Sequence, residues 1–195
     1  MKTLKLTEKD FKETDSYYRE YTGKTDVSDF DGHIEIEGDL GWVRFDSICA
    51  SGHVVAEAGS GIEAGSGIKA GSGIKAGWGI EAGSGIEAGW GIEAGWGIEA
   101  GSGIEAGWGI EAGLYITCKL SLNIAYRIFA GVAVWKKEVE DEEKTITCGK
   151  LESGTVEYGI LKETGLELEK DVEVERAIKL LGERGVLKDG KVLSK

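Results

Sequence analysis

Isoleucine recurs at every sixth position through the middle of this chain, and this spacing limits the possible folds more than any other feature. The repeated unit runs Ile, Glu or Lys, Ala, Gly, Ser or Trp, and Gly. An isoleucine every six residues would spiral around an α-helix instead of marking one face, and each glycine would cost a helix about 1 kcal/mol. The repeat therefore excludes helix and favours short strands. The isoleucines occupy positions 62, 68, 74, 80, 86, 92, 98, 104, 110 and 116.

Each unit predicts one strand and one corner of a β-solenoid. In the segment Gly-Ile-Glu-Ala, isoleucine and alanine face one side of the strand and glutamate faces the other. The glycines around Ser or Trp then turn a corner, because glycine reaches backbone conformations that other residues avoid. Strands joined by corners at a fixed period stack into a wound sheet with a dry interior. The predicted fold class is mainly β, a parallel β-helix.

Three units, or 18 residues, would form one triangular coil, and this assumption predicts which side chains stack. Lys69 then lies over Glu87, and Lys75 lies over Glu93. A two-sided coil of 12 residues would also group the tryptophans, and silk-like antiparallel stacking is the structural rival to a wound coil. The 18-residue coil sorts the corner residues into three columns: Ser66, Ser84 and Ser102; Trp78 and Trp96; Trp90 and Trp108.

The period continues past the perfect repeats as far as Val134, and looser strand patterns precede it. The solenoid is therefore predicted over residues 33–135. Residues 1–32 are predicted to form a helical cap segment that begins its helix at Thr7. A cap is expected there, since an open solenoid end is an unpaired strand edge that invites aggregation. Three aromatic residues are expected to seat this segment on the first coil: Tyr17, Tyr18 and Tyr21.

Residues 136–195 are predicted to form a small α+β appendage of hairpin, helix and hairpin. Two strands would flank a turn at Ser153-Gly154, while glycines five residues apart also allow a brief pentapeptide-like winding. Asp171 is the expected N-cap of the helix, whose apolar face begins at Val174. The final hairpin would turn at Asp189-Gly190.

The chain is acidic, with 35 Asp and Glu against 23 Lys and Arg and a formal net charge of -12. This balance argues against direct binding to nucleic acid phosphates and favours basic partners. The first residues lack the apolar run of a signal peptide, and no stretch reaches the ~20 apolar residues of a membrane span. Three widely spaced cysteines without a CxxC pair indicate reduced thiols. We therefore expect a cytoplasmic protein without membrane contact.

The sequence offers few residues for catalysis. His33 and His53 are the only histidines, and neither lies in a triad, an HExxH motif or a metal-binding cluster. A glutamate in every repeat describes a solvated face, not a tuned pair of acid and base. We expect no enzyme activity, no catalytic residue, no metal site and no cofactor.

Two sets of repeat side chains are the candidate binding residues. A tryptophan between two glycines would point outward at a corner, and exposed apolar patches mark contact surfaces. Alternatively, flanking segments fold back over the rings, or a wider coil holds them inside. Carboxylates at ~4.8 Å steps can imitate a nucleic acid backbone, although a charged face that serves only solubility is the plainer explanation. The candidates are Trp78, Trp90, Trp96, Trp108, Glu81, Glu87, Glu93, Glu99, Glu105 and Glu111.

The segments GHIEIEGDL and IEAGWGIEAG share a rhythm in which glycines flank an I-x-A/I pair. This rhythm resembles the β-helical proteins typified by bactofilins and the β-helix of the flagellar assembly protein A family. The resemblance implies a right-handed winding of similar coil size and, for bactofilins, end-to-end filaments without nucleotide. The near-identical repeats, the tryptophans and the C-terminal appendage depart from these families. A looser similarity, in shape and charge but not in repeat length, is to pentapeptide-repeat proteins that mimic DNA.

Together these patterns predict a non-enzymatic acidic β-solenoid that binds a protein. By analogy with compact acidic repeat proteins, the partner would be a basic nucleic-acid-binding enzyme and the chain its inhibitor, carried by a phage or mobile element. The alternative is a self-assembling structural scaffold of the bactofilin type, in which the partner is another copy of the chain.

Overall fold

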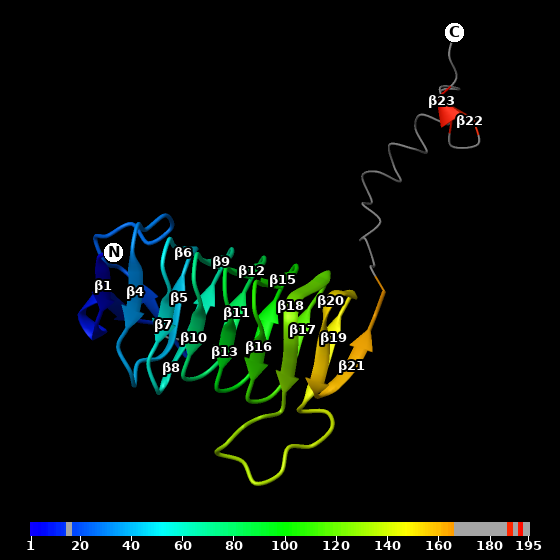
Figure 1. Ribbon diagram of the computed structural model, residues 1–195. Helices are drawn as coiled ribbons and strands as arrows, with labels where there is room; N and C mark the ends of the chain where they lie inside the picture. Colours follow the sequence, from blue (N-terminus) through cyan, green and yellow to red (C-terminus); the bar gives the residue numbers. More distant parts are fainter. Residues whose placement is uncertain (15–16, 166–186, 189–190, 193–195) are drawn as a thin grey trace. The chain divides into compact units, whose positions relative to one another are not determined.

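The computed structural model describes residues 1–14, 17–165, 187–188 and 191–192, and residues 1–165 form one compact unit. That unit is a parallel β-solenoid of about seven coils, each about 18 residues long (Figure 1). Strand register sets the coil length, since Ile74 pairs with Ile92 and Ile92 with Ile110. The predicted mainly β solenoid and its 18-residue period are therefore confirmed, and the 12-residue coil and the antiparallel stack are excluded.

Each coil contributes one short strand to each of three faces, which we number in chain order. Face 1 contains β1 (Thr3–Leu6), β4 (His33–Ile36), β7 (Val54–Ala56), β10 (Ile74–Ala76), β13 (Ile92–Ala94) and β16 (Ile110–Ala112). Face 2 contains β2 (Phe11–Glu13), β3 (Tyr18–Tyr21), β5 (Gly41–Phe45), β8 (Ser60–Ala64), β11 (Ile80–Ala82), β14 (Ile98–Ala100), β17 (Ile116–Cys118), β19 (Thr145–Cys148) and β21 (Ile160–Glu163). Face 3 contains β6 (Ile48–Ala50), β9 (Ile68–Ala70), β12 (Ile86–Ala88) and β15 (Ile104–Ala106).

Two longer strands cross from face 3 to face 1. Leu122 of β18 (Ser121–Ala130) pairs with β15 on face 3, and Ile128 of the same strand pairs with β16 on face 1. Strand β20 (Lys150–Tyr158) follows β18 in parallel across both faces. Faces 1 and 3 are thereby joined into one sheet at this end of the solenoid.

The interior is filled by the repeat isoleucines and alanines. From Ile62 to Ile116 no repeat isoleucine is more than 2% exposed, and the alanines between them are buried as well. Because strand residues alternate between the two sides, the Ile and Ala of each unit point inward together. Fully burying one such isoleucine stabilises the fold by about 1.5–3 kcal/mol, so this column is the main source of stability. The predicted burial of the isoleucine and alanine column is confirmed.

Glycine is needed at the corners for a reason other than the expected one. No glycine from Gly65 to Gly113 has a positive φ. Instead, successive coils pass so closely that a side chain does not fit. A Cβ on the first glycine of each corner from Gly83 to Gly113 would lie 1.9–2.1 Å from a backbone carbonyl oxygen of the preceding coil. Close backbone approach, and not a turn conformation, therefore fixes glycine at these positions.

The N-terminal segment is mainly strand, which corrects the predicted helical cap. Its one helical element is the three-residue 3-10 helix η1 (Glu8–Asp10), where the Asp10 carboxylate accepts a hydrogen bond of 2.8 Å from the Thr7 N–H. Strand pairing prevails because Leu6 and Phe11 bury their side chains against the end of the solenoid core. Tyr21 seats the segment as predicted, with its ring centroid 5.4 Å from that of Phe45, whereas Tyr17 is 94% exposed and does not.

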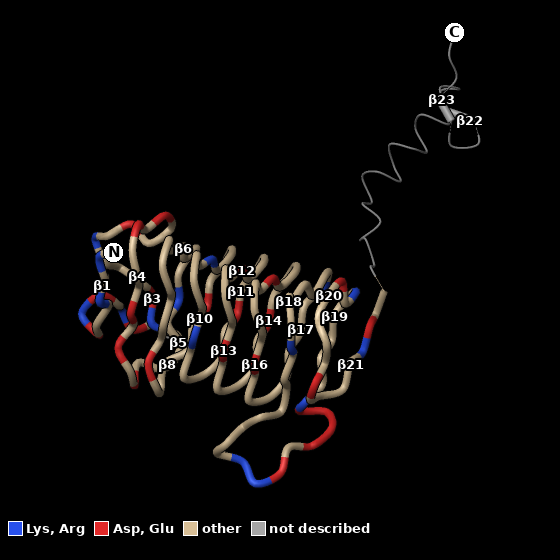
Figure 2. Tube along the Cα trace, in the orientation of Figure 1, with Lys and Arg blue, Asp and Glu red and all other residues tan. Residues whose placement is uncertain are grey.

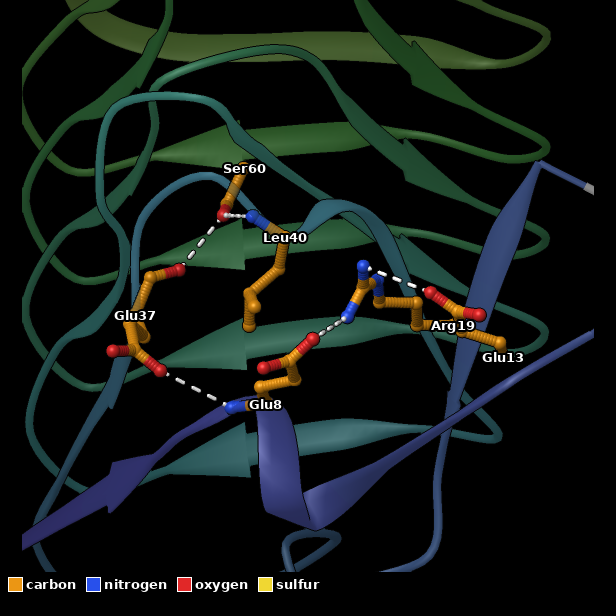
Figure 3. A network of polar contacts seen from close by, with 6 residues as sticks. All are labelled: Glu8, Glu13, Arg19, Glu37, Leu40 and Ser60. Atoms are coloured by element: carbon orange, nitrogen blue, oxygen red, sulfur yellow. Dashed lines mark hydrogen bonds and ion pairs between the residues drawn. The ribbon is translucent and has the colours of Figure 1, made fainter.

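A polar network ties this segment to the first coils (Figure 3). Arg19 forms an ion pair of 3.0 Å with Glu8, whose backbone N–H donates to the carboxylate of Glu37 at 3.1 Å. The buried hydroxyl of Ser60 donates to the Glu37 carbonyl at 2.7 Å and accepts the Leu40 N–H at 3.0 Å. Each buried polar group of this network therefore has a partner, as burial requires.

The solenoid also continues beyond the predicted end at residue 135. A loop of residues 131–144 projects from the stack, and parallel strands β19, β20 and β21 follow it (Figure 1). The predicted hairpin at Ser153-Gly154 is wrong, because β20 runs through both residues and pairs in parallel with β18. Thr145 pairs with Ile160, which gives a last coil of 15 residues, or three five-residue units. The pentapeptide-like alternative is therefore the one that the structure adopts.

Residues 166–195 form a second unit, which we describe by itself. Strands β22 (Leu187–Lys188) and β23 (Lys191–Val192) pair in antiparallel fashion, as predicted for the hairpin around Asp189-Gly190. The helix predicted from Asp171 lies outside the described residues.

Candidate functional site

The outward side chains of each face stack in register into one row per face. The six candidate glutamates are therefore divided among three directions, and no single ladder contains them all. Figure 2 shows acidic positions on successive coils along the stack. The pairs are Glu93 and Glu111 on face 1, Glu81 and Glu99 on face 2, and Glu87 and Glu105 on face 3.

Two of these glutamates are engaged by lysines of the preceding coil. Lys69 contacts Glu87 at 2.7 Å and Lys75 contacts Glu93 at 2.6 Å, so both predicted pairings are confirmed. Glu111, one coil beyond Glu93, is exposed and forms no ion pair with any described residue. Its carboxylate is therefore available as a hydrogen-bond acceptor on face 1.

The row on face 2 is partly buried. Arg44 donates from Nε to Glu63 at 2.9 Å, and the hydroxyl of Tyr115 donates to Glu99 at 2.6 Å. Glu81 lies between these two glutamates in the same row. Burial, and then the charges of Glu99 and Glu63, raise the pKa of Glu81 above its usual value. Glu63 and Glu99 of this row are thus already bound by other side chains of the protein.

Glycine creates a furrow beside each charged row. The glycine before each repeat isoleucine faces outward, like the charged residue two positions later, because strand residues alternate. On face 2 the chain's own rings fill this furrow. A Cβ on Gly61 or Gly79 would lie 2.9 or 2.7 Å from the ring of Trp42, and one on Gly97 would lie 2.5 Å from the ring of Tyr115.

The corresponding furrow on face 1 is open. Among the described residues, a Cβ on Gly73, Gly91 or Gly109 would meet only the backbone carbonyl oxygen of the next coil, at 3.1–3.3 Å, and no side chain beyond its chain neighbours within 4 Å. His53 and Arg127 hold the same outward position at the two ends of this furrow. The three glycines form the floor of a groove of about 720 Å³.

An aromatic column borders this groove at the corner between faces 3 and 1. Trp90 is 71% exposed, Trp108 is 65% exposed and Tyr126 is 58% exposed. The rings of Trp108 and Tyr126 have their centroids 5.1 Å apart and line the groove. On its other side the groove is lined by Lys75, Glu93 and Glu111. The predicted outward orientation is therefore confirmed for Trp90 and Trp108.

The second tryptophan column is covered in part. Trp78 and Trp96 stack with centroids 5.2 Å apart and planes inclined by 10°. Trp135, from the projecting loop, packs 6.1 Å from Trp96 and donates from Nε1 to the Gly95 carbonyl at 3.2 Å. For this column the alternative that a flanking segment folds back is the one observed.

The histidines and cysteines form no recognised constellation. His33 and His53 stack with centroids 4.0 Å apart at one end of face 1. Among the residues that the structure describes, no three His, Cys, Asp or Glu side chains are placed to hold a metal ion. Burial raises the pKa of the Cys118 thiol to about 12, and all three cysteines are free.

Comparisons with protein-family models, with curated proteins and with solved structures found no match to this chain. The resemblance to bactofilins and to pentapeptide-repeat proteins therefore rests on repeat rhythm and charge, and the structure itself shows a parallel β-solenoid. Within the described part of the chain, no helix is long and apolar enough to cross a membrane.

Sequence reasoning found Trp108 and Glu111 but missed the residues that shape the groove between them. Tyr126 lies within a strand, where an aromatic residue gives no functional signal. Trp42 and Tyr115 do carry a signal, because each stands at the outward position that the repeats reserve for glycine. The open furrow on face 1 follows only from its comparison with face 2.

Proposed function

We propose that this protein is a non-enzymatic binding module that holds a segment of a partner protein in the groove on face 1. One observation carries the proposal: exposed Trp108 and Tyr126 border a groove whose floor is covered by no side chain of the described residues. Tryptophan and tyrosine are the residues most enriched where protein partners gain binding energy. The stacked strands fix these rings before a partner arrives, so little ordering entropy is lost on binding.

The proposal assigns no catalytic step to the groove. Nucleophilic catalysis needs a nucleophile within hydrogen-bond reach of a base. Among the described residues that line the groove there is no serine, threonine or cysteine, and Lys75 is engaged by Glu93. Exposed rings and carboxylates of this kind suit recognition.

The acidic balance of the chain favours a basic partner. Its net charge of -12, together with carboxylates on all three faces, supports the narrower hypothesis of an inhibitor that occupies the nucleic-acid-binding surface of an enzyme. Each row holds only two to four carboxylates, so such a partner would also have to contact the aromatic column. Its affinity should then fall steeply with added salt. Binding that does not depend on salt would be consistent with the binding module but would contradict the hypothesis of DNA mimicry.

Assembly of copies is the second candidate function. Strands β20 and β21 end the solenoid, and within the described residues each pairs on one side only. An unpaired strand edge is a template for another chain. Light scattering over a concentration range separates the candidates, since discrete particles contradict the scaffold and growing filaments contradict the binding module.

Selection from a displayed peptide library tests the binding module directly. Peptides enriched on the full-length protein should bind Trp90→Ala/Trp108→Ala at least tenfold more weakly, with an unchanged circular dichroism spectrum. Ser84→Ala/Ser102→Ala, at another corner column, is the matched control and should bind like the wild type. Equal binding to both variants, or no enrichment at all, would refute the proposal.

A further inference from the structure

Face 2 shows that the glycine furrow accepts aromatic rings. The ring of Trp42 lies over Gly61 and Gly79, and the ring of Tyr115, which also contacts the charged row, lies over Gly97. Tyr115 stands at the outward position one coil after Gly97, and its ring lies back over that glycine. Its hydroxyl donates to Glu99 at 2.6 Å. Gly97 and Glu99 are the two outward residues of one repeat. A single repeat therefore binds a phenol completely, with glycine below the ring and a carboxylate at the hydroxyl.

Face 1 carries the same repeat, and no ring of the described residues lies over its glycine. Residues 96–101 and 108–113 have the identical sequence WGIEAG, so Gly109 and Glu111 correspond to Gly97 and Glu99. Arg127 stands where face 2 has its tyrosine, and its side chain pairs with Glu157 at 3.6 Å. A Cβ on Gly109 would accordingly meet only the Arg127 carbonyl oxygen, at 3.1 Å.

We propose that the furrow on face 1 is a binding site for a tyrosine side chain of the partner protein. The ring lies on Gly109 beside Trp108, and the hydroxyl donates to Glu111. This inference rests on the proposed function and names what the groove recognises. Glu93 is already engaged by Lys75, so the repeat of Glu111 offers the free acceptor. The groove is larger than one ring, and the residues next to the tyrosine would run along its remaining length toward His53.

The chemistry of this site discriminates among close analogues. Phenylalanine fills the furrow but leaves Glu111 without its donor, and a site built for a hydroxyl rejects the analogue that lacks it. Phosphotyrosine brings negative charge against the same carboxylate and is repelled. A sugar ring could also stack on Trp108 and donate to Glu111. Tyrosine is favoured because an amino-acid side chain already occupies the matching furrow on face 2.

The test uses the full chain, with the indole N–H resonances of its tryptophans followed by NMR. The probes are the peptide Ac-Lys-Gly-Tyr-Gly-Lys-amide, its Phe and phosphotyrosine versions, and cellotetraose. The Tyr peptide should shift the Trp108 resonance saturably, the Phe peptide should bind at least fivefold more weakly, and the phosphotyrosine peptide should cause no shift. Equal affinities for Tyr and Phe, tighter binding of cellotetraose, or no saturable shift with any probe would overturn the inference.

Two variants and a control locate the site. Glu111→Ala should abolish the preference for Tyr over Phe, whereas Glu105→Ala, in an identically placed residue on face 3, should preserve it. Arg127→Tyr places a ring where face 2 has one, and should close the furrow and remove Tyr peptide binding while the fold is retained. Retained discrimination in Glu111→Ala would refute the assignment. Library peptides that need Trp108 but show no tyrosine preference would refute this inference and leave the proposed function standing.

Discussion

The two glycines that flank Trp90 should respond very differently to alanine. A Cβ on Gly89 would lie 2.1 Å from the Gly71 carbonyl oxygen, whereas a Cβ on Gly91 would lie 3.3 Å from the Gly109 carbonyl oxygen. Carbon and oxygen atoms without a covalent bond approach to about 3.3 Å. Gly89→Ala therefore requires the two coils to separate by roughly 1.2 Å, and Gly91→Ala requires almost no movement.

The cost of that separation follows from the contacts between the coils. The Gly89 N–H donates to the Ala70 carbonyl at 3.0 Å, and a movement of this size breaks the bond. Overpacking costs about 1–3 kcal/mol and a lost hydrogen bond about 0.5–1.5 kcal/mol, so Gly89→Ala should destabilise by about 3 kcal/mol. Gly91→Ala gains about 0.4–1 kcal/mol from a less flexible unfolded chain, which offsets its tight contact. It should stay within about 1 kcal/mol of the wild type.

Urea unfolding followed by circular dichroism measures both variants. The midpoint should fall clearly for Gly89→Ala and hardly move for Gly91→Ala, with similar slopes for all three proteins, since the slope reports the surface exposed on unfolding. If Gly91→Ala is as destabilising as Gly89→Ala, or if Gly89→Ala unfolds like the wild type, close coil approach is not the reason for glycine at this corner.

Three further predictions address the core, the charged rows and the thiols. Ile98→Ala should destabilise by about 2–5 kcal/mol and Ile98→Val by about 0.5–1.5 kcal/mol in the same urea titration, because this side chain is fully buried. Because the pKa of Glu81 is raised in the folded protein, folding is favoured while this carboxyl group is protonated. That stabilisation is complete below the unfolded pKa and is lost as pH rises through the folded pKa. Glu81→Gln should therefore be more stable than the wild type at pH 7 by about 1 kcal/mol, and thermal melts at pH 7 and pH 5 should show the advantage shrinking in acid. A thiol reagent should label partly exposed Cys49 in the native protein, but buried Cys118 and Cys148 only after unfolding.

The repeat predicts the coil because its period fits one geometry and conflicts with the others. Six is a multiple of the strand period, so every isoleucine faces the same side, and three units close one coil. The pairing of Lys69 with Glu87 depends on that closure, and it is found as predicted. Where the repeat is strict, sequence therefore specifies both the inside of the solenoid and the neighbours on its outside.

The two ends were harder to predict because local signals compete there with packing. Ser153-Gly154 has the composition of a hairpin turn, yet β20 continues through it and Gly154 takes a φ of 105° within the strand. A hairpin would leave the outer edge of β18 unpaired, whereas the parallel course pairs it and covers the end of the Ile128 column. Tertiary pairing thus overrides turn propensity at the last coil, as it does for the strands of the N-terminal segment.

The candidate site depends on the three-sided winding, because repeats that are neighbours in sequence lie on different faces. Consecutive repeats place Glu93 and Glu99 on different faces, so a row of charges needs residues 18 apart, and no row can be long in a chain of about seven coils. What distinguishes faces 1 and 2 is the residue that replaces the outward glycine where the perfect repeats end. Tyr115 folds back over the furrow of face 2 and closes it, whereas Arg127 turns to Glu157 and leaves the furrow of face 1 open. The residue at this one position, Tyr115 on face 2 and Arg127 on face 1, thus decides whether the furrow is filled by a ring of the chain itself or can receive a ring from a partner.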